Sequence, residues 1–357
     1  MSETREMIQG ALPSAQCAET GTSANPVAFT ISNTEPRRTV DGEILDAHDG
    51  CLEFFSGQYY LYGTRYGETN GFGKTNRYVC YSSPDLVHWN YRGELLPDAP
   101  KRTYYRPYVK YNKATRKYVL WYNADNGYGV AVADAPTGPY QIQNPSVRLK
   151  HGNLGVGDFG LLVDEDGAAY IAYNCVLSGH FEVKEEPIPH HKIAVEKLTP
   201  DYLASTMEGS DFVAGNCESP AMFKRGALYY LLFDNTCCFG ANGSGARVYT
   251  ASHPLGPFTY WGNINVKTDH PRDLPIAWTE PGTGRPDCII RAQQTHIATL
   301  PSPSGPLFIW MGDRWHSTPD KIKGHDFQYW SSPLQFEEDG MIRQLRREDQ
   351  WSYPAVK

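Results

Sequence analysis

Three acidic residues, Asp49, Asp158 and Glu218, each open a similar strand-turn-strand segment in a different part of the 357-residue sequence. In each segment the acid precedes an apolar run, then a turn that contains glycine, then a second run that contains tyrosine. Acidic residues in turns usually follow a strand, whereas these three precede one. A repeat that starts with a carboxylate can gather several carboxylates around one axis. Such a cluster is suited to general acid and base chemistry.

The strand-turn-strand segment recurs at intervals of roughly 50 to 75 residues, in the range expected of propeller blades. Its five copies lie near residues 49–62, 105–122, 158–173, 218–233 and 293–311. A second element follows each copy and consists of a strand that ends in a short turn containing proline. These elements lie near residues 81–89, 132–140, 195–202, 250–258 and, most weakly, 329–336.

The repeat predicts an all-β, five-bladed β-propeller that spans residues 37–357 as a single domain, with residues 1–36 as an N-terminal arm or tail. Because the first strand of each blade lines the central channel, we expect the three carboxylates to converge at one mouth of that channel. The content of 24 Tyr, 33 Gly and 26 Pro also favours many short strands joined by turns. The alternative is a β-sandwich whose hairpins carry these acids for ordinary structural reasons.

The charge of the chain restricts its partners. A formal net charge of -7 and a pI near 5.9 argue against binding to nucleic acid or to an anionic membrane. We therefore expect a neutral ligand and a monomer or weak oligomer. Residues 1–36 are polar and lack the apolar core of a signal peptide, which predicts a cytoplasmic protein, or a secreted one if a longer precursor is trimmed.

The eight cysteines are scattered, and no spacing with histidine suggests a zinc site. They are expected to be mostly reduced and packed, although the adjacent Cys237 and Cys238 could instead form a vicinal disulfide. The pair His190 and His191 lies in a charged run that predicts a solvated loop. A long loop over residues 178–190 is hypothesised to cap the site and to enforce cleavage from chain ends.

These residues carry a family resemblance over about residues 40–345: the chain resembles glycoside hydrolase family 43. Members of that family are five-bladed propellers that cleave polysaccharides with inversion at the anomeric carbon. The resemblance implies that Asp49, in a phrase with Gly50 where the family has proline, is the general base. It implies that Asp158, before Val163-Asp-Glu-Asp-Gly167, tunes the acid, and that Glu218, in Glu-Ser-Pro, is the acid itself.

Within the family the chain is similar to the exo-β-1,3-galactanase branch. Two positions differ from that branch. It usually has Gly where this chain has Asp49, with a glutamine matched by Gln293 in the place of the base, and it usually has a substrate-binding Glu where this chain has Tyr105. Shared phrases are Asp46-Ala-His48, Arg106-Pro-Tyr-Val-Lys-Tyr-Asn112, Cys217-Glu-Ser-Pro-Ala-Met-Phe-Lys224, Gln293-Gln-Thr295 and Gly312-Asp-Arg-Trp315.

Inverting hydrolysis needs an acid and a base roughly 6.5–9.5 Å apart, and a third carboxylate near the acid raises the pKa of that acid. Around Glu218, Asp49 and Asp158, sugar rings could stack on aromatic residues, of which Tyr105 and Trp315 are preferred over Trp121. Arg314 could bind a sugar hydroxyl, set the charge on Asp158 or pair with Asp313. The substrate-binding candidates are His48, Tyr105, Arg106, Gln293, Arg314 and Trp315.

The function expected from the resemblance is an inverting, exo-acting glycoside hydrolase that needs no cofactor. It would release terminal galactose, galactofuranose or arabinofuranose from a neutral glycan such as β-1,3-galactan or arabinogalactan. Many family members hold a central calcium, whose ligands the sequence does not identify. The alternatives are a carbohydrate-binding propeller without catalysis, an enzyme that positions water with Gln293 instead of Asp49, and a scaffold for protein partners.

Overall fold

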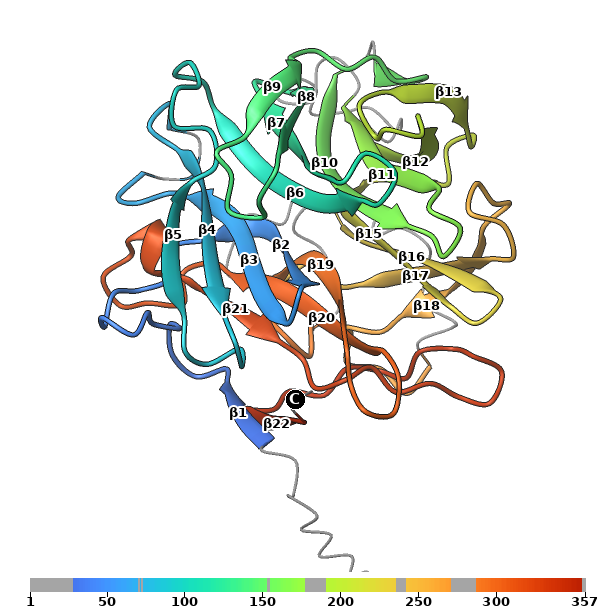
Figure 1. The fold of residues 1–357 in the computed structure, drawn as a ribbon. Helices are drawn as coiled ribbons and strands as arrows, with labels where there is room; N and C mark the ends of the chain where they lie inside the picture. Colours follow the sequence, from blue (N-terminus) through green and yellow to red (C-terminus); the bar gives the residue numbers. More distant parts are fainter. Residues whose placement is uncertain are drawn as a thin grey trace, which may run out of the picture.

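The computed structural model describes residues 28–69, 71, 73–152, 155–176, 191–235, 242–270 and 287–354. In these residues five antiparallel sheets stand in a ring around a central channel, as Figure 1 shows. The predicted five-bladed β-propeller is therefore confirmed, and each predicted hairpin forms the first two strands of one blade. The described part of the chain contains no helix with the length and apolar character of a membrane span.

Each blade runs outward from the channel in the order of the sequence, except that β14 of blade 3 pairs with β12. Blade 1 contains β2 (His48–Phe55), β3 (Gln58–Arg65), β4 (Arg77–Ser83) and β5 (Asn90–Glu94). Blade 2 contains β6 (Tyr104–Asn112), β7 (Lys117–Ala124), β8 (Gly127–Ala133) and β9 (Gln141–Asn144). Blade 3 contains β10 (Val156–Val163), β11 (Ala169–Val176), β12 (His191–Leu198), β13 (Ser205–Gly209) and β14 (Ala214–Gly215). Blade 4 contains β15 (Cys217–Arg225), β16 (Leu228–Asn235), β17 (Arg247–Ala251) and β18 (Thr259–Asn263). Blade 5 contains β19 (Gln293–Leu300), β20 (Leu307–Arg314) and β21 (Phe327–Trp330).

The turn residues account for the hairpins. In blade 1, Ser56 and Gly57 both have positive φ (49° and 84°), and they form the two-residue loop whose backbone twist suits an antiparallel pair. Aromatic residues fill the space between blades: Tyr62, Tyr108 and Trp121 are fully buried in the largest core cluster. The five described cysteines are buried thiols packed in the protein, as predicted, whereas Cys237 and Cys238 lie outside the described residues.

The ring is held closed by the two ends of the described chain. Within the segment predicted as an N-terminal arm, β1 (Ala28–Ser32) pairs with β22 (Gln350–Pro354) beside blade 5 (Figure 1). The side chain of the next residue, Asn33, accepts a hydrogen bond from the Trp330 N–H (3.0 Å) and donates one to the Trp330 carbonyl (2.9 Å). Asn33 thereby supplies the outer edge of β21 with the two hydrogen bonds that a neighbouring strand would make.

A β-bulge interrupts the inner hairpin of every blade close to the start of its first strand. In blades 1 to 4 two residues of the first strand stand opposite one residue of the second, and in blade 5 there is one extra residue. Bulges redirect side chains and are common next to active sites. The extra residues are Asp49-Gly50, Arg106-Pro107, Gly157-Asp158, Ser219-Pro220 and Thr295.

The bulge explains one difference from the family pattern, the glycine after Asp49. A Cβ atom at Gly50 would lie 1.8 Å from the carbonyl oxygen of Tyr62 on β3. No side chain fits at that distance, so proline is excluded at this position. Asp49 itself has a φ of 60°, an uncommon conformation for a residue with a side chain. The packing of β3 against the bulge therefore maintains a strained backbone at a predicted site residue.

We expect Asn33→Ala to lower the free energy of unfolding by about 2–4 kcal/mol, because the buried N–H and C=O groups of Trp330 lose a partner. Chemical denaturation measures this loss. Thr34→Ala is the control, since Thr34 is on the same segment and its side-chain contact with Ser32 is exposed. A loss in Asn33→Ala no larger than in Thr34→Ala would show that Asn33 does not close the ring.

Candidate active site

The three predicted carboxylates lie at the starts of β2, β10 and β15, but at different positions relative to the bulge. Glu218 is the last paired residue before the bulge and stands opposite Asp234. Asp49 is the first residue inside a bulge, and Asp158 is the second. The exposed fraction of the side chain is 13% for both Glu218 and Asp158, so both are reachable from solvent.

Arg106 lies at the centre of the site with no exposed surface. Its Nε is 2.8 Å from Asp158 Oδ1, its Nη2 donates to Ser219 Oγ (2.9 Å), and its Nη1 donates to the Thr295 carbonyl (3.2 Å). Ser219 Oγ in turn donates to Asp158 Oδ2 at 2.7 Å. One guanidinium therefore connects the first strands of blades 2, 3, 4 and 5.

The charge of Arg106 is stabilised by its surroundings. Burial lowers the pKa of Arg106, but the carboxylates of Asp158 and Asp49 outweigh this effect and raise the pKa above its ordinary value. A buried cation of this kind needs charged partners. Because Arg106 is fully covered, it positions the acids and has no surface left for a sugar. The cation that contacts Asp158 is thus Arg106, and not Arg314 as the sequence had suggested.

Asp49 is almost completely buried and lies next to a second carboxylate. Its backbone N–H donates to Asp313 Oδ2 (2.8 Å), and its Oδ2 accepts a hydrogen bond from the Tyr66 hydroxyl. Burial and then the charge of Asp313 raise the pKa of Asp49 to about 7, against the opposing effects of Arg106 and the Tyr66 hydrogen bond. Oδ1 of Asp49 makes no hydrogen bond within the described residues, which leaves it available to a ligand or to water.

His48 contacts Asp313 of this acidic pair. Its Nδ1 lies 3.2 Å from Asp313 Oδ1, and its ring is stacked on Tyr66 with a centroid separation of 5.5 Å. Burial lowers the pKa of His48, but the hydrogen bond to Asp313 and the charges of Asp313, Asp46 and Asp49 together raise it to about 9. His48 was predicted to bind substrate; with an exposed fraction of 1%, it contacts other site residues.

Gln293 and Trp315 are joined by a hydrogen bond. Trp315 Nε1 donates to Gln293 Oε1 (2.7 Å), and Gln293 Nε2 donates to Ser219 Oγ (3.2 Å). Lys323, on the short 3-10 helix η2 (Lys323–His325), places its Nζ 4.0 Å above the Trp315 ring. Burial lowers the pKa of Lys323, while Asp326, Asp49 and Asp313 act in the opposite direction. Trp315 is only 2% exposed, so its ring forms part of the wall of the site.

Tyr105 lies within electrostatic reach of all three predicted catalytic acids. Burial raises the pKa of its phenol, and Asp158, Glu218 and Asp49 each raise it further. Its hydroxyl donates to Asn126 Oδ1 at 2.8 Å in an exposed position. Of the aromatic residues considered from the sequence, Tyr105 is therefore the one placed to meet a sugar. Trp121 is fully buried and donates to the Tyr202 carbonyl, which makes it a core residue.

Glu218 has a neighbour that the sequence did not predict. Nδ1 of His191 lies 3.2 Å from Glu218 Oε1 and 2.6 Å from Asn174 Nδ2. The prediction of a solvated loop is wrong for His191, because this residue is the first of β12 and is buried. Strand pairing with β11 fixes its backbone, and its ring lies against Glu218. His190 and the predicted capping loop over residues 178–190 lie outside the described residues.

Arg314 is the one predicted site residue whose described contacts point away from the acids. Its Nη1 donates to the Asn33 carbonyl (3.1 Å), and its guanidinium lies 4.8 Å from the centre of the Phe327 ring. Asp313, which the sequence analysis offered as a partner of Arg314, contacts His48 and Asp49 instead. Adjacent residues on a strand point to opposite faces, which separates Asp313 from Arg314.

The site contains supporting residues that were not identified as such from the sequence. Ser219 and Asp313 fall within phrases already singled out, Glu218-Ser-Pro220 and Gly312-Asp-Arg-Trp315, so their proximity to the site could have been inferred. Their partners could not, because each contact joins two blades. The sequence analysis did not identify the observed roles of five residues: Tyr66, His191, Ser219, Asp313 and Lys323.

No cluster of metal-ligating side chains marks the predicted calcium site in the described residues. These residues include no group of three or more His, Cys, Asp or Glu that could hold a metal ion. In the channel, Glu53 is already paired with Lys110 at 2.6 Å, and the nearby His296 Nε2 lies 4.0 Å from the same Glu53 oxygen. The structural calcium therefore stays a prediction.

Comparisons with known proteins agree with this fold. A beta-D-galactofuranosidase of Aspergillus niger is 26% identical over 260 residues, which cover 66% of this chain and 69% of the relative. An arabinoxylan arabinofuranohydrolase of Bacillus subtilis is 26% identical over 287 residues, which cover 68% of this chain and 53% of the relative. The chain thus spans between about half and about two thirds of the length of these relatives.

Solved structures show the same architecture. A family 43 β-1,3-galactosidase superposes with a TM-score of 0.68 and 26% identity, covering 91% of this chain and 64% of that one. An exo-β-1,3-galactanase from Phanerochaete chrysosporium, solved with β-1,3-galactotriose, superposes with a TM-score of 0.71 and 22% identity, covering 91% and 68%. The model of glycosyl hydrolases family 43 matches residues 45–283, which include Asp49, Asp158 and Glu218. The chain therefore belongs to glycosyl hydrolases family 43.

Proposed function

We propose that this protein is an inverting, exo-acting glycoside hydrolase that removes terminal sugars from a neutral glycan. The observation that carries the proposal is the meeting of Asp49, Asp158 and Glu218 around Arg106 and Tyr105, from three different blades. Two of these acids have partly exposed side chains and one is buried with a raised pKa. Carboxylates in such different environments are suited to different roles in acid and base catalysis. Like family 43 enzymes generally, it would need no cofactor.

In this proposal Glu218 protonates the leaving oxygen of the glycosidic bond. His191 contacts its carboxyl group and orients it. Asp158 acts on Glu218 indirectly. It accepts a hydrogen bond from Ser219, the residue that follows Glu218. Arg106 binds both Asp158 and Ser219 and so keeps this segment in place.

Asp49 is proposed to activate the water on the opposite face of the sugar. Its free Oδ1 can accept a proton, whereas both ends of the Gln293 amide are occupied by Trp315 and Ser219. The water then attacks the anomeric carbon as the leaving oxygen takes the proton of Glu218, and its own proton passes to Asp49. The products are a sugar of inverted configuration and a shortened glycan.

The charges at the site favour a neutral sugar. Among the described residues, the cations of the site are Arg106, His48 and Lys323, which are 0%, 1% and 7% exposed, so none of these three is available to bind a sugar acid. The accessible groups are carboxylates and the phenol of Tyr105. The names of the relatives point to galactose-type sugars or arabinofuranose as the released unit. Tyr105 would stack against an apolar face of that sugar.

We expect Glu218→Gln to lower kcat/KM by about 10²–10⁴ on aryl glycosides with poor leaving groups, because general acid catalysis is lost. On dinitrophenyl glycosides, whose leaving group needs no proton, the loss should be far smaller. The substrates are aryl galactosides, galactofuranosides, arabinofuranosides and xylosides, and NMR of the first product gives its anomeric configuration.

Glu208→Gln is the matched control, since it makes the same change at an exposed position on β13. An equal loss in Glu218→Gln for good and poor leaving groups would exclude Glu218 as the acid. If the wild-type protein binds these sugars but turns over none of them, a carbohydrate-binding propeller replaces the enzyme.

Asp49→Ala should lose at least about 10²-fold in kcat, and Gln293→Ala about tenfold, because only Asp49 takes up the proton of the water. Azide, a nucleophile that needs no general base, should restore activity to Asp49→Ala and not to Gln293→Ala, and should form a glycosyl azide of inverted configuration. If Gln293→Ala loses more kcat than Asp49→Ala, and azide restores activity only to Gln293→Ala, then Gln293 and not Asp49 activates the water.

The pH profile should follow the pKa of Asp49, which is raised to about 7. A general base must be ionised, so kcat/KM should fall as the pH decreases through this value. Asp313→Asn removes a negative charge that raises the pKa of Asp49, so the acidic limb should move to lower pH, by about one unit. The exposed Asp320→Asn should leave it unchanged. A shift of the limb to higher pH in Asp313→Asn would contradict the role of Asp49.

A further inference from the structure

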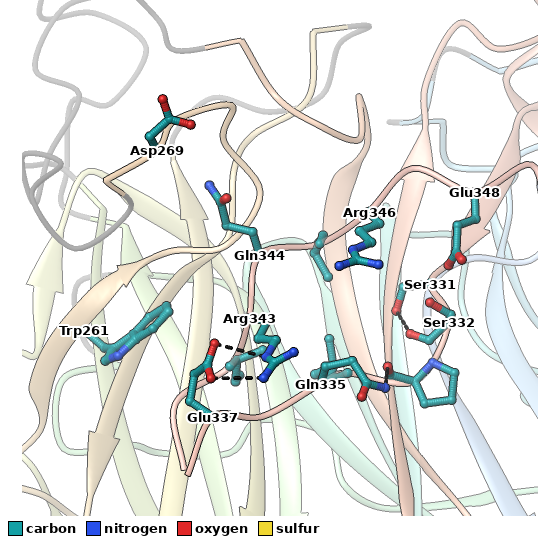
Figure 2. Close-up of a pocket in the computed structure, with 14 residues that line it drawn as sticks. Trp261, Asp269, Ser331, Ser332, Gln335, Glu337, Arg343, Gln344, Arg346 and Glu348 are labelled. Atoms are coloured by element: carbon teal, nitrogen blue, oxygen red, sulfur yellow. Dashed lines mark hydrogen bonds and ion pairs between the residues drawn. The ribbon is translucent and has the colours of Figure 1, made fainter. Parts of the chain in front are cut away.

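A groove of about 750 Å³ lies on the outside of the ring, between blades 4 and 5 (Figure 2). It lies beside the beginning of β20, where the Leu334 N–H donates to the Phe308 carbonyl (2.8 Å). Asp313 of the candidate active site is at the other end of the same strand. None of the residues that line the groove is one of the predicted site residues. The groove is therefore separate from the active site.

The walls of the groove are built rigidly from residues that bind one another. Arg343 and Glu337 form a bidentate ion pair, with N–O distances of 3.0 and 3.1 Å (Figure 2). Gln344 Nε2 donates to the Val266 and Thr268 carbonyls, both at 2.8 Å, which ties the segment to blade 4. A preformed wall loses little conformational entropy when a ligand binds.

Two polar side chains in the groove retain unused hydrogen-bonding capacity. Glu348 Oε2 is buried from solvent and has no hydrogen-bond partner within the described residues. The guanidinium of Arg346, two residues earlier, makes no hydrogen bond or ion pair with the described part of the chain. Figure 2 shows both side chains pointing from one segment toward Ser331 and Ser332. The groove therefore offers a hydrogen-bond donor, Arg346, and a hydrogen-bond acceptor, Glu348, on the same segment.

The chemistry of this pair indicates the class of ligand. Neighbouring hydroxyl groups of a sugar can donate to a carboxylate and accept from a guanidinium at the same time. Arg343 and Glu337 neutralise each other, so the groove has no strong excess of charge that would select an ion. Pro333 and the small exposed part of Trp261 (9%) supply apolar surface for the C–H face of a sugar ring. The volume is within the range of about 300–1,000 Å³ that is usual for small-ligand sites.

We propose that this groove is a second, non-catalytic binding site for a neutral oligosaccharide, which holds the polymer while its end is cleaved at the channel. The choice of a glycan rests on the proposed function of the active site. Retention of the polymer raises the effective concentration of chain ends at the active site without changing the chemical step. The groove should therefore matter for polysaccharides and not for aryl glycosides.

The test compares Arg346→Ala and Glu348→Gln with wild-type protein. The probes are β-1,3-galactan, arabinan and xylan in affinity electrophoresis, with β-1,3-galactotriose in calorimetry. We expect both variants to weaken retention by at least one of these polymers by about fivefold and to slow its degradation, with aryl glycoside turnover unchanged. Glu348→Gln is expected to preserve folding, because Oε2 has no partner to lose within the described residues.

Arg347→Ala is the matched control, since it removes the same charge at the adjacent position, which does not line the groove. Retention and degradation that are equal in all variants, or absent in wild-type protein that still cleaves aryl glycosides, would overturn the inference and leave the proposed function intact. Retention that depends on Arg346 and Glu348 in a protein without turnover would support the groove and refute the proposed enzyme.

Discussion

The buried guanidinium of Arg106 is the contact on which the candidate site depends. A charge without exposed surface is tolerated only when other charges and hydrogen bonds replace water, and Arg106 finds them on the first strands of the other blades. Asp158, Ser219 and the Thr295 carbonyl contact it directly, and Asp49 acts on it through its charge. The same interactions that stabilise the cation fix the carboxylates. The centre of the ring and the chemistry proposed for it therefore have one physical origin.

The bulges convert a regular repeat into an asymmetric site. Each blade repeats the same hairpin, yet the extra residues at the bulge differ from blade to blade. Asp49, Arg106 and Ser219 share a positive φ at the first bulge position. These strained conformations are tolerated because neighbouring strands pack closely around them, as the contact of Gly50 with Tyr62 illustrates. The acids of the site are thus positioned by the hairpins, while Tyr66, Trp315 and Lys323 contact them or their neighbours from the connecting segments.

Ring closure and the groove both involve segments on the outside of the ring. Asn33 and the pairing of β1 with β22 complete blade 5, and the C-terminal segment that follows β21 crosses to blade 4. That crossing creates the groove around Arg346 and Glu348. The C-terminal segment thus takes part both in closure of the ring, through β22, and in formation of the groove. A substrate that is a polymer can make use of both positions, whereas a small glycoside reaches only the channel.

The sequence by itself determined the five blades and the catalytic carboxylates that we propose. Hairpin turns such as Ser56-Gly57 are local, because two residues with positive φ set the turn, and the recurrence of Asp49, Asp158 and Glu218 before apolar runs is visible without coordinates. The supporting contacts were decided only by the tertiary structure. Whether Arg106 or Arg314 reaches Asp158 depends on which blades face each other across the channel.

The same limit applies to His191 and to Asp313. A histidine at the edge of a charged run has the composition of a solvated loop, and only the pairing of β12 with β11 buries it against Glu218. The contact between Asp313 and Asp49 joins blades 5 and 1, so it depends on the closure of the ring. Local propensity acts over a few residues, whereas these contacts join residues that are up to 265 positions apart in the chain, so they follow from closure of the whole propeller.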